Sequence, residues 1–257
     1  MFDTFSAYGA PSCKWDKKLG HNVLTASGFV TILTMASQMI PSMSASTLGI
    51  LCSTWVFMSS STTTRSALNP MGLVNGVAAS QKVAEGNLMV SRTTLLLQYF
   101  VAQVILLLLE QPISSVCKLH DRLREFIAKL RLGTATTWMG CFGADSAKGT
   151  WLCSNSQCVL TYLTRTLVRS EHNFSKKQVT IPHYSGGVTG GPALKETQEY
   201  TEEFCVEVLE AVTRTSFETL VIDVPSPGVP QVTDLWEDAN ASDIAAFIKL
   251  PVDRLVV

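Results

Sequence analysis

Two short apolar runs, each ending in polar residues, constrain the fold of this 257-residue chain most strongly. Residues 48–56 have the sequence LGILCSTWV, and residues 104–112 have the sequence VILLLLEQP. Continuous apolar runs of this length are typical of buried parallel strands, and open α/β sheets gather their ligands at the carboxyl ends of such strands. Cys52 on the first run and Glu110 at the end of the second are therefore candidates for one shared site.

The hydrophobic periodicity predicts helices and strands in alternation. The expected elements, in chain order, are a helix at 22–39, a strand at 48–58, a helix at 77–100, a strand at 101–109 ended by Pro112, a helix at 119–132, a hairpin of strands 134–142 and 150–153, helices at 157–169 and 197–214, and a strand at 220–224. This order predicts an α/β fold with a parallel sheet, to which the hairpin adds an antiparallel edge.

The domain boundaries follow from composition. We expect an irregular segment at 1–21, one incomplete α/β domain at 22–215 and an acidic, Pro-containing, partly disordered tail at 216–257. The first twenty residues carry charges and no early apolar core, so they do not form a secretory signal. An intracellular location, cytoplasmic or nuclear, is therefore expected.

Charge is distributed unevenly along the chain, although the net charge is only -1. Residues 118–177 hold ten Lys or Arg against four Asp or Glu, whereas residues 178–257 hold four against thirteen. The basic stretch is a candidate nucleic-acid surface, and a solvated helical face is the alternative interpretation.

A membrane-associated protein is a further alternative, because only 16% of the residues are charged. The candidate membrane segments are residues 29–58 and 95–109. The second is 15 residues long and contains two glutamines, whereas a spanning helix needs about 20 apolar residues. Buried core is therefore the preferred interpretation of both segments.

Several short segments together resemble one protein family. They are CSTWV at 52–56, TR at 64–65, NPMG at 69–72, GN at 86–87, EQP at 110–112, WMGCFGA at 138–144, Lys148, and SN at 154–155. In order and spacing they resemble a protein group of dinoflagellate algae, over about residues 45–205. Longer members of that group are similar to Rossmann-type methyltransferases, in particular the cytosine-5 DNA methyltransferases.

The resemblance implies roles for particular residues. In cytosine-5 methyltransferases a cysteine thiolate adds to the base ring and a glutamate holds a ring nitrogen, which implies these roles for Cys52 and Glu110. Ser53 and Gln111, which follow them directly, become candidate binding residues. The chain departs from the family pattern, because Leu51 replaces a proline and Gln111-Pro112 replaces Asn-Val.

Each candidate also has a structural interpretation. Cys52 fits an inert core thiol, because reactive cysteines need an accessible, electropositive setting. Glu110 fits a structural pairing with Arg65, with Arg92 or with backbone N–H groups. Alternatively, the two arginines are candidate ligands for a phosphate or a carboxylate. The cysteines and histidines are too scattered to predict a metal site.

The methyl donor of that family, S-adenosylmethionine, sits on a glycine-rich turn after the first strand. Before Leu48 the chain offers no such turn after a convincing strand. We therefore expect no cofactor unless an upstream segment completes the fold. The sequence favours an incomplete or non-catalytic methyltransferase-like domain over an active S-adenosylmethionine-dependent nucleic-acid methyltransferase.

Overall fold

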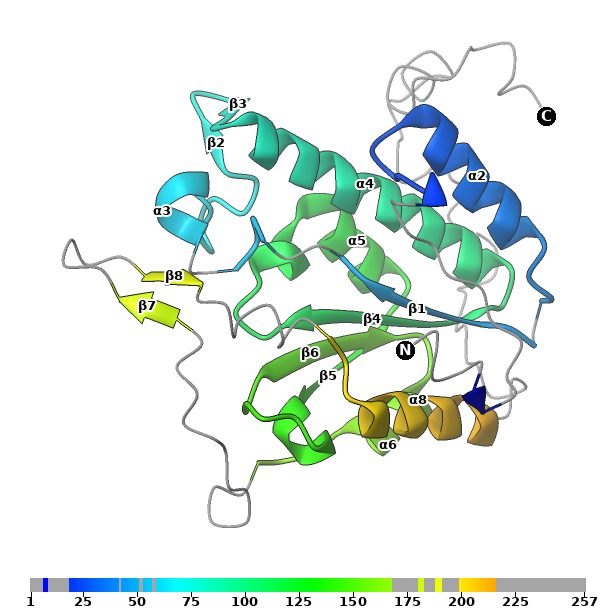
Figure 1. Ribbon diagram of the computed structural model, residues 1–257. Coiled ribbons are helices and arrows are strands. Elements are labelled where there is room, and N and C mark those ends of the chain that lie inside the picture. The colour runs from blue at the N-terminus through cyan, green and yellow to red at the C-terminus, as the bar shows by residue number, and fades with distance from the viewer. Residues whose placement is uncertain are drawn as a thin grey trace, which may run out of the picture.

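A four-stranded mixed sheet lies between two layers of helices in the computed structural model (Figure 1). The structure describes residues 7–8, 19–41, 43–50, 53–56, 59–167, 180–182, 188–190 and 199–215. The strands, in their order across the sheet, are β1 (Ala45–Gly49), β4 (Leu106–Pro112), β6 (Gly149–Ser154) and β5 (Gly133–Trp138). β1 is parallel to β4, and the other pairs are antiparallel. The α/β prediction is confirmed, with one parallel pair in a mixed sheet.

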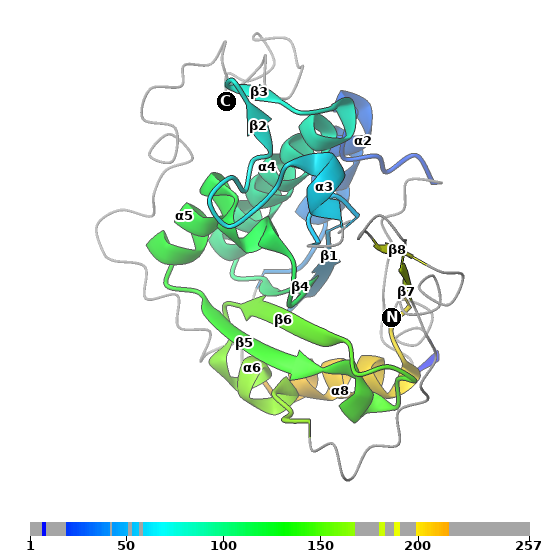
Figure 2. The same ribbon diagram turned by 90° about the vertical axis from the view of Figure 1, so that its left-hand side faces the viewer.

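The two faces of the sheet are covered by different helices (Figure 2). One face packs against α2 (Ala26–Ser37), α4 (Gln81–Ala102) and α5 (Asp121–Lys129). The other packs against α6 (Gln157–Leu163) and α8 (Glu202–Arg214). The remaining elements are short: α3 (Ser60–Thr63), β2 (Leu73–Val74), β3 (Val77–Ala78), η3 (Val116–Leu119), η4 (Met139–Phe142), β7 (Thr180–Pro182) and β8 (Val188–Gly190).

Side-chain caps fix where the longer helices begin. The hydroxyls of Thr25, Ser80, Ser156 and Thr201 each accept a hydrogen bond from a backbone N–H in the first turn of the helix that follows. Such caps satisfy donors that the helix itself leaves without a partner. Four of the expected helices therefore have defined starting points.

β4 explains the second apolar run of the sequence, because it is buried on both faces. Leu107 and Leu109 pack against α2, α4 and α5, whereas Leu106 and Leu108 pack against the α6 and α8 layer. Side chains alternate between the faces of a strand, so a strand covered on both sides has no polar face.

The first apolar run is not one strand. β1 ends at Gly49, so the predicted strand at 48–58 is wrong beyond that residue. Trp55 is fully buried, but it belongs to the loop after β1 and stacks with Arg65. The run extends past β1 because the loop after the strand contributes the buried Trp55, and an apolar sequence pattern does not distinguish a strand from such a loop.

Most other predicted elements are present with shifted ends. α4 continues to Ala102 and β4 begins at Leu106, so the predicted strand at 101–109 begins too early, although it ends near Pro112 as expected. The hairpin of β5 and β6 is confirmed. The predicted strand at 220–224, the tail at 216–257 and most of the segment at 1–21 lie outside the described residues.

The second candidate membrane segment contributes to the core, whereas the first is only partly buried where it is described. Residues 95–102 form the end of α4, residues 106–109 lie in β4, and α2 has 12 residues. Within the described part of the chain, no helix combines the length and apolar character that crossing a membrane requires.

The core position of β4 predicts a large stability difference between two leucines. Leu108 is 1% exposed and Leu68 is 99% exposed. Leu108→Ala removes buried methyl groups and leaves a cavity, so it should lower the free energy of unfolding by about 3 kcal/mol. Leu68→Ala should change it by less than about 0.5 kcal/mol. Urea denaturation of both variants measures the difference, and equal midpoints would contradict the two-sided burial of β4.

Candidate functional site

The ends of β1 and β4 lie side by side, as the two apolar runs predict. Gly49 pairs with Glu110 in the parallel register. The Gln111 side chain then joins the two strand ends, because its Nε2 donates a hydrogen bond of 2.6 Å to the Ile50 carbonyl. Its Oε1 accepts a hydrogen bond from the Ser115 hydroxyl at 3.1 Å. Gln111 is 1% exposed, so its observed contacts tie the strand ends together within the protein.

Glu110 points to the opposite face of the sheet from Gln111. Its Oε2 accepts a hydrogen bond of 2.7 Å from the Tyr200 hydroxyl, just before α8. Its Oε1 is buried and has no hydrogen-bond partner. Burial raises the pKa of Glu110, and the charge of Lys148 and the Tyr200 hydrogen bond only partly oppose this shift. Burial thus makes ionisation of Glu110 less favourable than in water, and in its protonated form the second oxygen can donate a hydrogen bond.

Gly49 makes room for the tyrosine. A Cβ atom at this position would lie 2.9 Å from the Tyr200 hydroxyl oxygen, so a larger residue would displace it. The Tyr200 ring stacks on Phe204 with 5.5 Å between centroids, and the Lys148 ammonium lies 5.5 Å from the centre of the tyrosine ring. Glu110, Tyr200, Lys148 and Gly49 form what we call the strand-end site.

Of the strand-end site, the sequence identified only Glu110 as a candidate, and Gly49, Tyr200 and Lys148 were not predicted. Tyr200 follows Glu110 by 90 positions and precedes an amphipathic helix, which is an ordinary context for a tyrosine. Lys148 belongs to the segments that carry the family resemblance, but nothing in its neighbourhood links it to Glu110. Tyr200 lies just before α8, which packs on the sheet, and Lys148 directly precedes β6, which pairs with β4.

The arginines predicted to pair with Glu110 do not do so. Arg65 stacks over the Trp55 ring at 3.4 Å and donates to the carbonyls of Pro70 and Val83. Arg92 lies between α2 and α4, where it donates to the Val23 carbonyl at 2.8 Å. Burial lowers the pKa of both guanidinium groups. The predicted pairing fails because both arginines lie on the α4 side of the sheet, whereas Glu110 faces α8.

Cys52 and Ser53 are the two candidate site residues of the first apolar run, and the structure describes only Ser53. Cys52 lies outside the described residues, so its proposed nucleophilic role stays a prediction. Ser53 is exposed, in the loop that leads to Trp55. The structure thus brings Gln111 to the two strand ends, but it does not bring Arg65 or Arg92 to Glu110.

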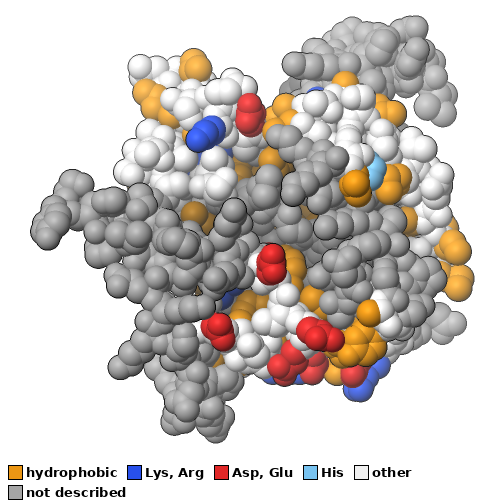
Figure 3. Space-filling view, viewed as in Figure 1, with side chains coloured by type: hydrophobic (Ala, Val, Ile, Leu, Met, Phe, Trp, Pro, Cys, Tyr) orange, Lys and Arg blue, Asp and Glu red, His pale blue; other side chains and the backbone are white. Residues whose placement is uncertain are grey.

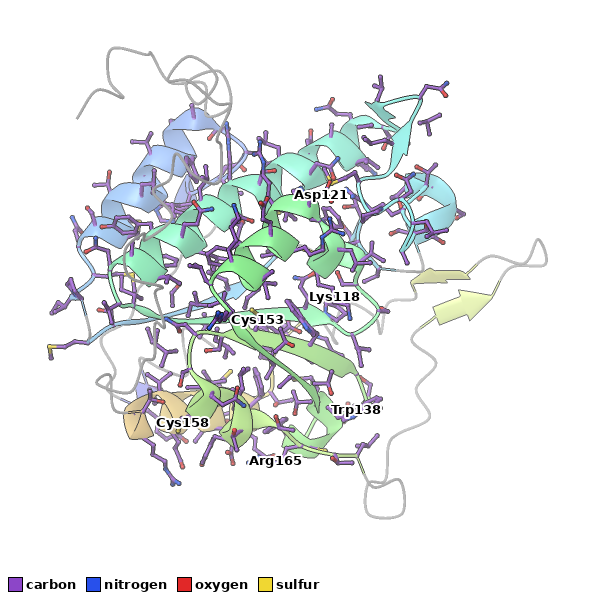
Figure 4. All side chains as sticks on the ribbon, turned by 180° about the vertical axis from the view of Figure 1, so that it is seen from behind. Lys118, Asp121, Trp138, Cys153, Cys158 and Arg165 are labelled. Carbon is purple, nitrogen blue, oxygen red and sulfur yellow. The ribbon has the colours of Figure 1, made fainter. Side chains whose placement is uncertain are left out.

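The described part of the basic region, residues 118–167, does not present one cationic face. Three of its cations form ion pairs, which are Arg124 with Asp121, Lys129 with Glu125, and Arg165 with Glu207. Figure 4 shows Lys118 and Asp121 on the α5 side of the sheet and Arg165 on the α6 side. Acidic side chains gather in the lower part of Figure 3, where α8 lies.

The comparisons with known proteins add no relative. Neither a scan with protein-family models nor searches of curated proteins and solved structures gave a significant match to the chain.

In the described part of the chain, no three His, Cys, Asp or Glu side chains gather where they could hold a metal ion.

The buried acid predicts a pH dependence of stability. The pKa of Glu110 is raised above its ordinary value of 4.5, so the folded state binds this proton more tightly than the unfolded state. Its contribution to stability is therefore complete below pH 4.5 and is lost as the pH rises through the folded pKa. Glu110→Gln cannot ionise, so the unfolding free energy of the wild type minus that of the variant should fall as the pH rises above 4.5.

Urea denaturation across this pH range measures that difference. Glu125→Gln, an exposed change on α5, is the control and should show little pH-dependent difference from the wild type. A difference for Glu110→Gln that stays constant or rises with pH would contradict a buried, preferentially protonated Glu110.

Proposed function

We propose that the chain is an incomplete, non-catalytic methyltransferase-like domain that retains a hydrogen-bonding site for a pyrimidine base. The observation that carries this proposal is the state of Glu110, a buried carboxyl group with a raised pKa and one oxygen without a partner. It stands at the end of a parallel strand pair, where open α/β sheets hold their ligands.

A neutral carboxyl group matches one edge of a pyrimidine. With Oε2 accepting from Tyr200, a proton on Oε1 can be donated to a ring nitrogen. Oε1 is the oxygen that lacks a partner, and the adjoining Gly49 is exposed. This pairing of an acid with a ring nitrogen is the one that the resemblance to cytosine-5 methyltransferases implies.

The connection between β1 and β4 supports a Rossmann-type origin. The two strands are parallel, and α4 lies between them in sequence and packs on one face of the sheet. A parallel pair joined through a helix is the repeating unit of such folds. The antiparallel β6 and β5 then take the place of further parallel strands, which is the respect in which this chain departs from a full Rossmann sheet.

The described residues before β1 are the reason for proposing that the domain is not catalytic. Among the described residues, α2 and its connection precede β1, and no strand with a glycine-rich turn is found there. S-adenosylmethionine is held on such a turn in the family that the chain resembles. In the described part of the chain, the strand-end site thus has groups that can recognise a base, but no turn of the kind that holds the methyl donor.

Two titrations test this proposal. Calorimetry with S-adenosylmethionine should give no micromolar binding by the full chain. Deoxycytidine, followed by ligand-observed NMR, should bind weakly and lose at least about tenfold in affinity in Glu110→Ala, which corresponds to about 1.4 kcal/mol. Glu125→Ala, an exposed carboxylate on α5, is the matched control and should bind as the wild type does.

The possible results separate the two parts of the proposal. Clear micromolar binding of S-adenosylmethionine would overturn the absence of a cofactor site. Deoxycytidine binding that is absent, or equal in the two variants, would overturn base recognition by Glu110.

An active S-adenosylmethionine-dependent nucleic-acid methyltransferase is the second candidate function. The preference of Glu110 for its neutral form favours it, because a general acid at the ring nitrogen is needed for the methylation chemistry. Transfer of labelled methyl groups to DNA or RNA by the wild type, abolished in Cys52→Ser, would establish this alternative. We expect no transfer by either protein.

A further inference from the structure

A second group of buried polar side chains lies on the opposite face of the sheet from Glu110. Thr54 and Trp55 come from the loop after β1, Arg65 follows α3, and all three contact α4 at Gly86. A Cβ atom on Gly86 would lie 2.7 Å from Thr54 Oγ1, 3.0 Å from Arg65 Nη2 and 3.4 Å from Trp55 Nε1. These three polar atoms therefore lie close together beside this glycine, where a Cβ atom would not fit. We call these four residues the Gly86 cluster.

Two donors of the Gly86 cluster have no acceptor. Trp55 is completely buried and Arg65 is 3% exposed, yet Trp55 Nε1 and Arg65 Nε each lack a hydrogen-bond partner. The Nη atoms of Arg65 are already engaged with the Pro70 and Val83 carbonyls. A buried polar group without a partner is strongly unfavourable, and such groups are normally satisfied by protein, water or a ligand.

The Gly86 cluster also contains a positive charge, the Arg65 guanidinium, without an ion-pair partner among the described residues. His120 packs edge-on against Trp55 and has its pKa lowered to about 4 by burial and by the charges of Arg122 and Arg65. The group therefore offers positive charge and N–H donors with no matching anion.

We propose that the Gly86 cluster binds a small oxyanion, a carboxylate or a phosphate group. Its acceptor oxygens would take the indole N–H of Trp55, the Nε–H of Arg65 and the hydroxyl of Thr54. Ser53 is exposed and Thr54 is half-buried, so they are the part of this region nearest to solvent. Charge-assisted hydrogen bonds to guanidinium are the strong form of this interaction.

This site is independent of the strand-end site. The two lie on opposite faces of the sheet, and no residue belongs to both. Failure of nucleobase binding at Glu110 would leave the oxyanion proposal unaffected.

Titration of the full chain with inorganic phosphate and with acetate, at constant ionic strength held by chloride, tests the proposal. Calorimetry should show saturable binding of at least one anion, accompanied by a rise in the thermal midpoint. Thr54→Val removes one donor at a half-buried position and should raise the dissociation constant about threefold to tenfold. Arg65→Lys should raise it at least about tenfold, because lysine has no Nε donor.

Thr94→Val is the matched control, since it removes another α4-side hydroxyl that donates to the helix's own Val90 carbonyl. It should bind the anion as the wild type does. If Arg65→Lys does not fold, the proposal is still tested by comparing the anion dissociation constants of Thr54→Val and Thr94→Val.

The probe that binds more tightly identifies the natural group as a phosphate ester or a carboxylate. The absence of saturable binding of both probes, or equal affinity in Thr54→Val and Thr94→Val, would overturn the proposal. The unpartnered donors would then be satisfied by enclosed water.

Discussion

The burial of β4 on both faces is the constraint on which the rest of the molecule depends. Six consecutive residues of this strand are buried, four of them leucines that divide between the two helical layers. A strand in that position has no polar face, so it contributes only through packing and its backbone ladder. The first polar residues, Glu110 and Gln111, are therefore buried before the strand ends, and each must find a partner within the protein.

Alternation along the strand gives those two polar residues different environments. Gln111 faces the α4 and α5 layer and hydrogen-bonds with the Ile50 carbonyl and the Ser115 hydroxyl, so both ends of its amide are used. Glu110 faces the α8 layer, where Tyr200 satisfies only one of its oxygens. The residue with complete hydrogen bonding supports the structure, whereas the residue with an unused oxygen is the better candidate for binding a ligand.

Much of the fold could be predicted because apolar periodicity reports directly on burial. The order of helices and strands, the hairpin of β5 and β6 and the proximity of the two strand ends all follow from local patterns. The end of β1 could not be predicted, since Trp55 is as buried in a loop as it would be in a strand. The partner of Glu110 was also beyond local patterns, because whether Tyr200 or an arginine reaches it depends on which face of β4 the carboxylate occupies.

The two buried polar sites differ in how their ionisable group responds to burial. A carboxyl group such as Glu110 can escape the cost of burial by taking up a proton, which leaves a neutral group suited to an uncharged ligand. A guanidinium group has no such escape, because even the pKa of about 10 that burial gives Arg65 keeps it charged at neutral pH. Burial on one face of the sheet therefore favours recognition of a neutral heterocycle. Burial on the other face favours recognition of an anion. The two sites lie on opposite faces of the sheet, so the Arg65 guanidinium and the Glu110 carboxyl group do not pair with each other.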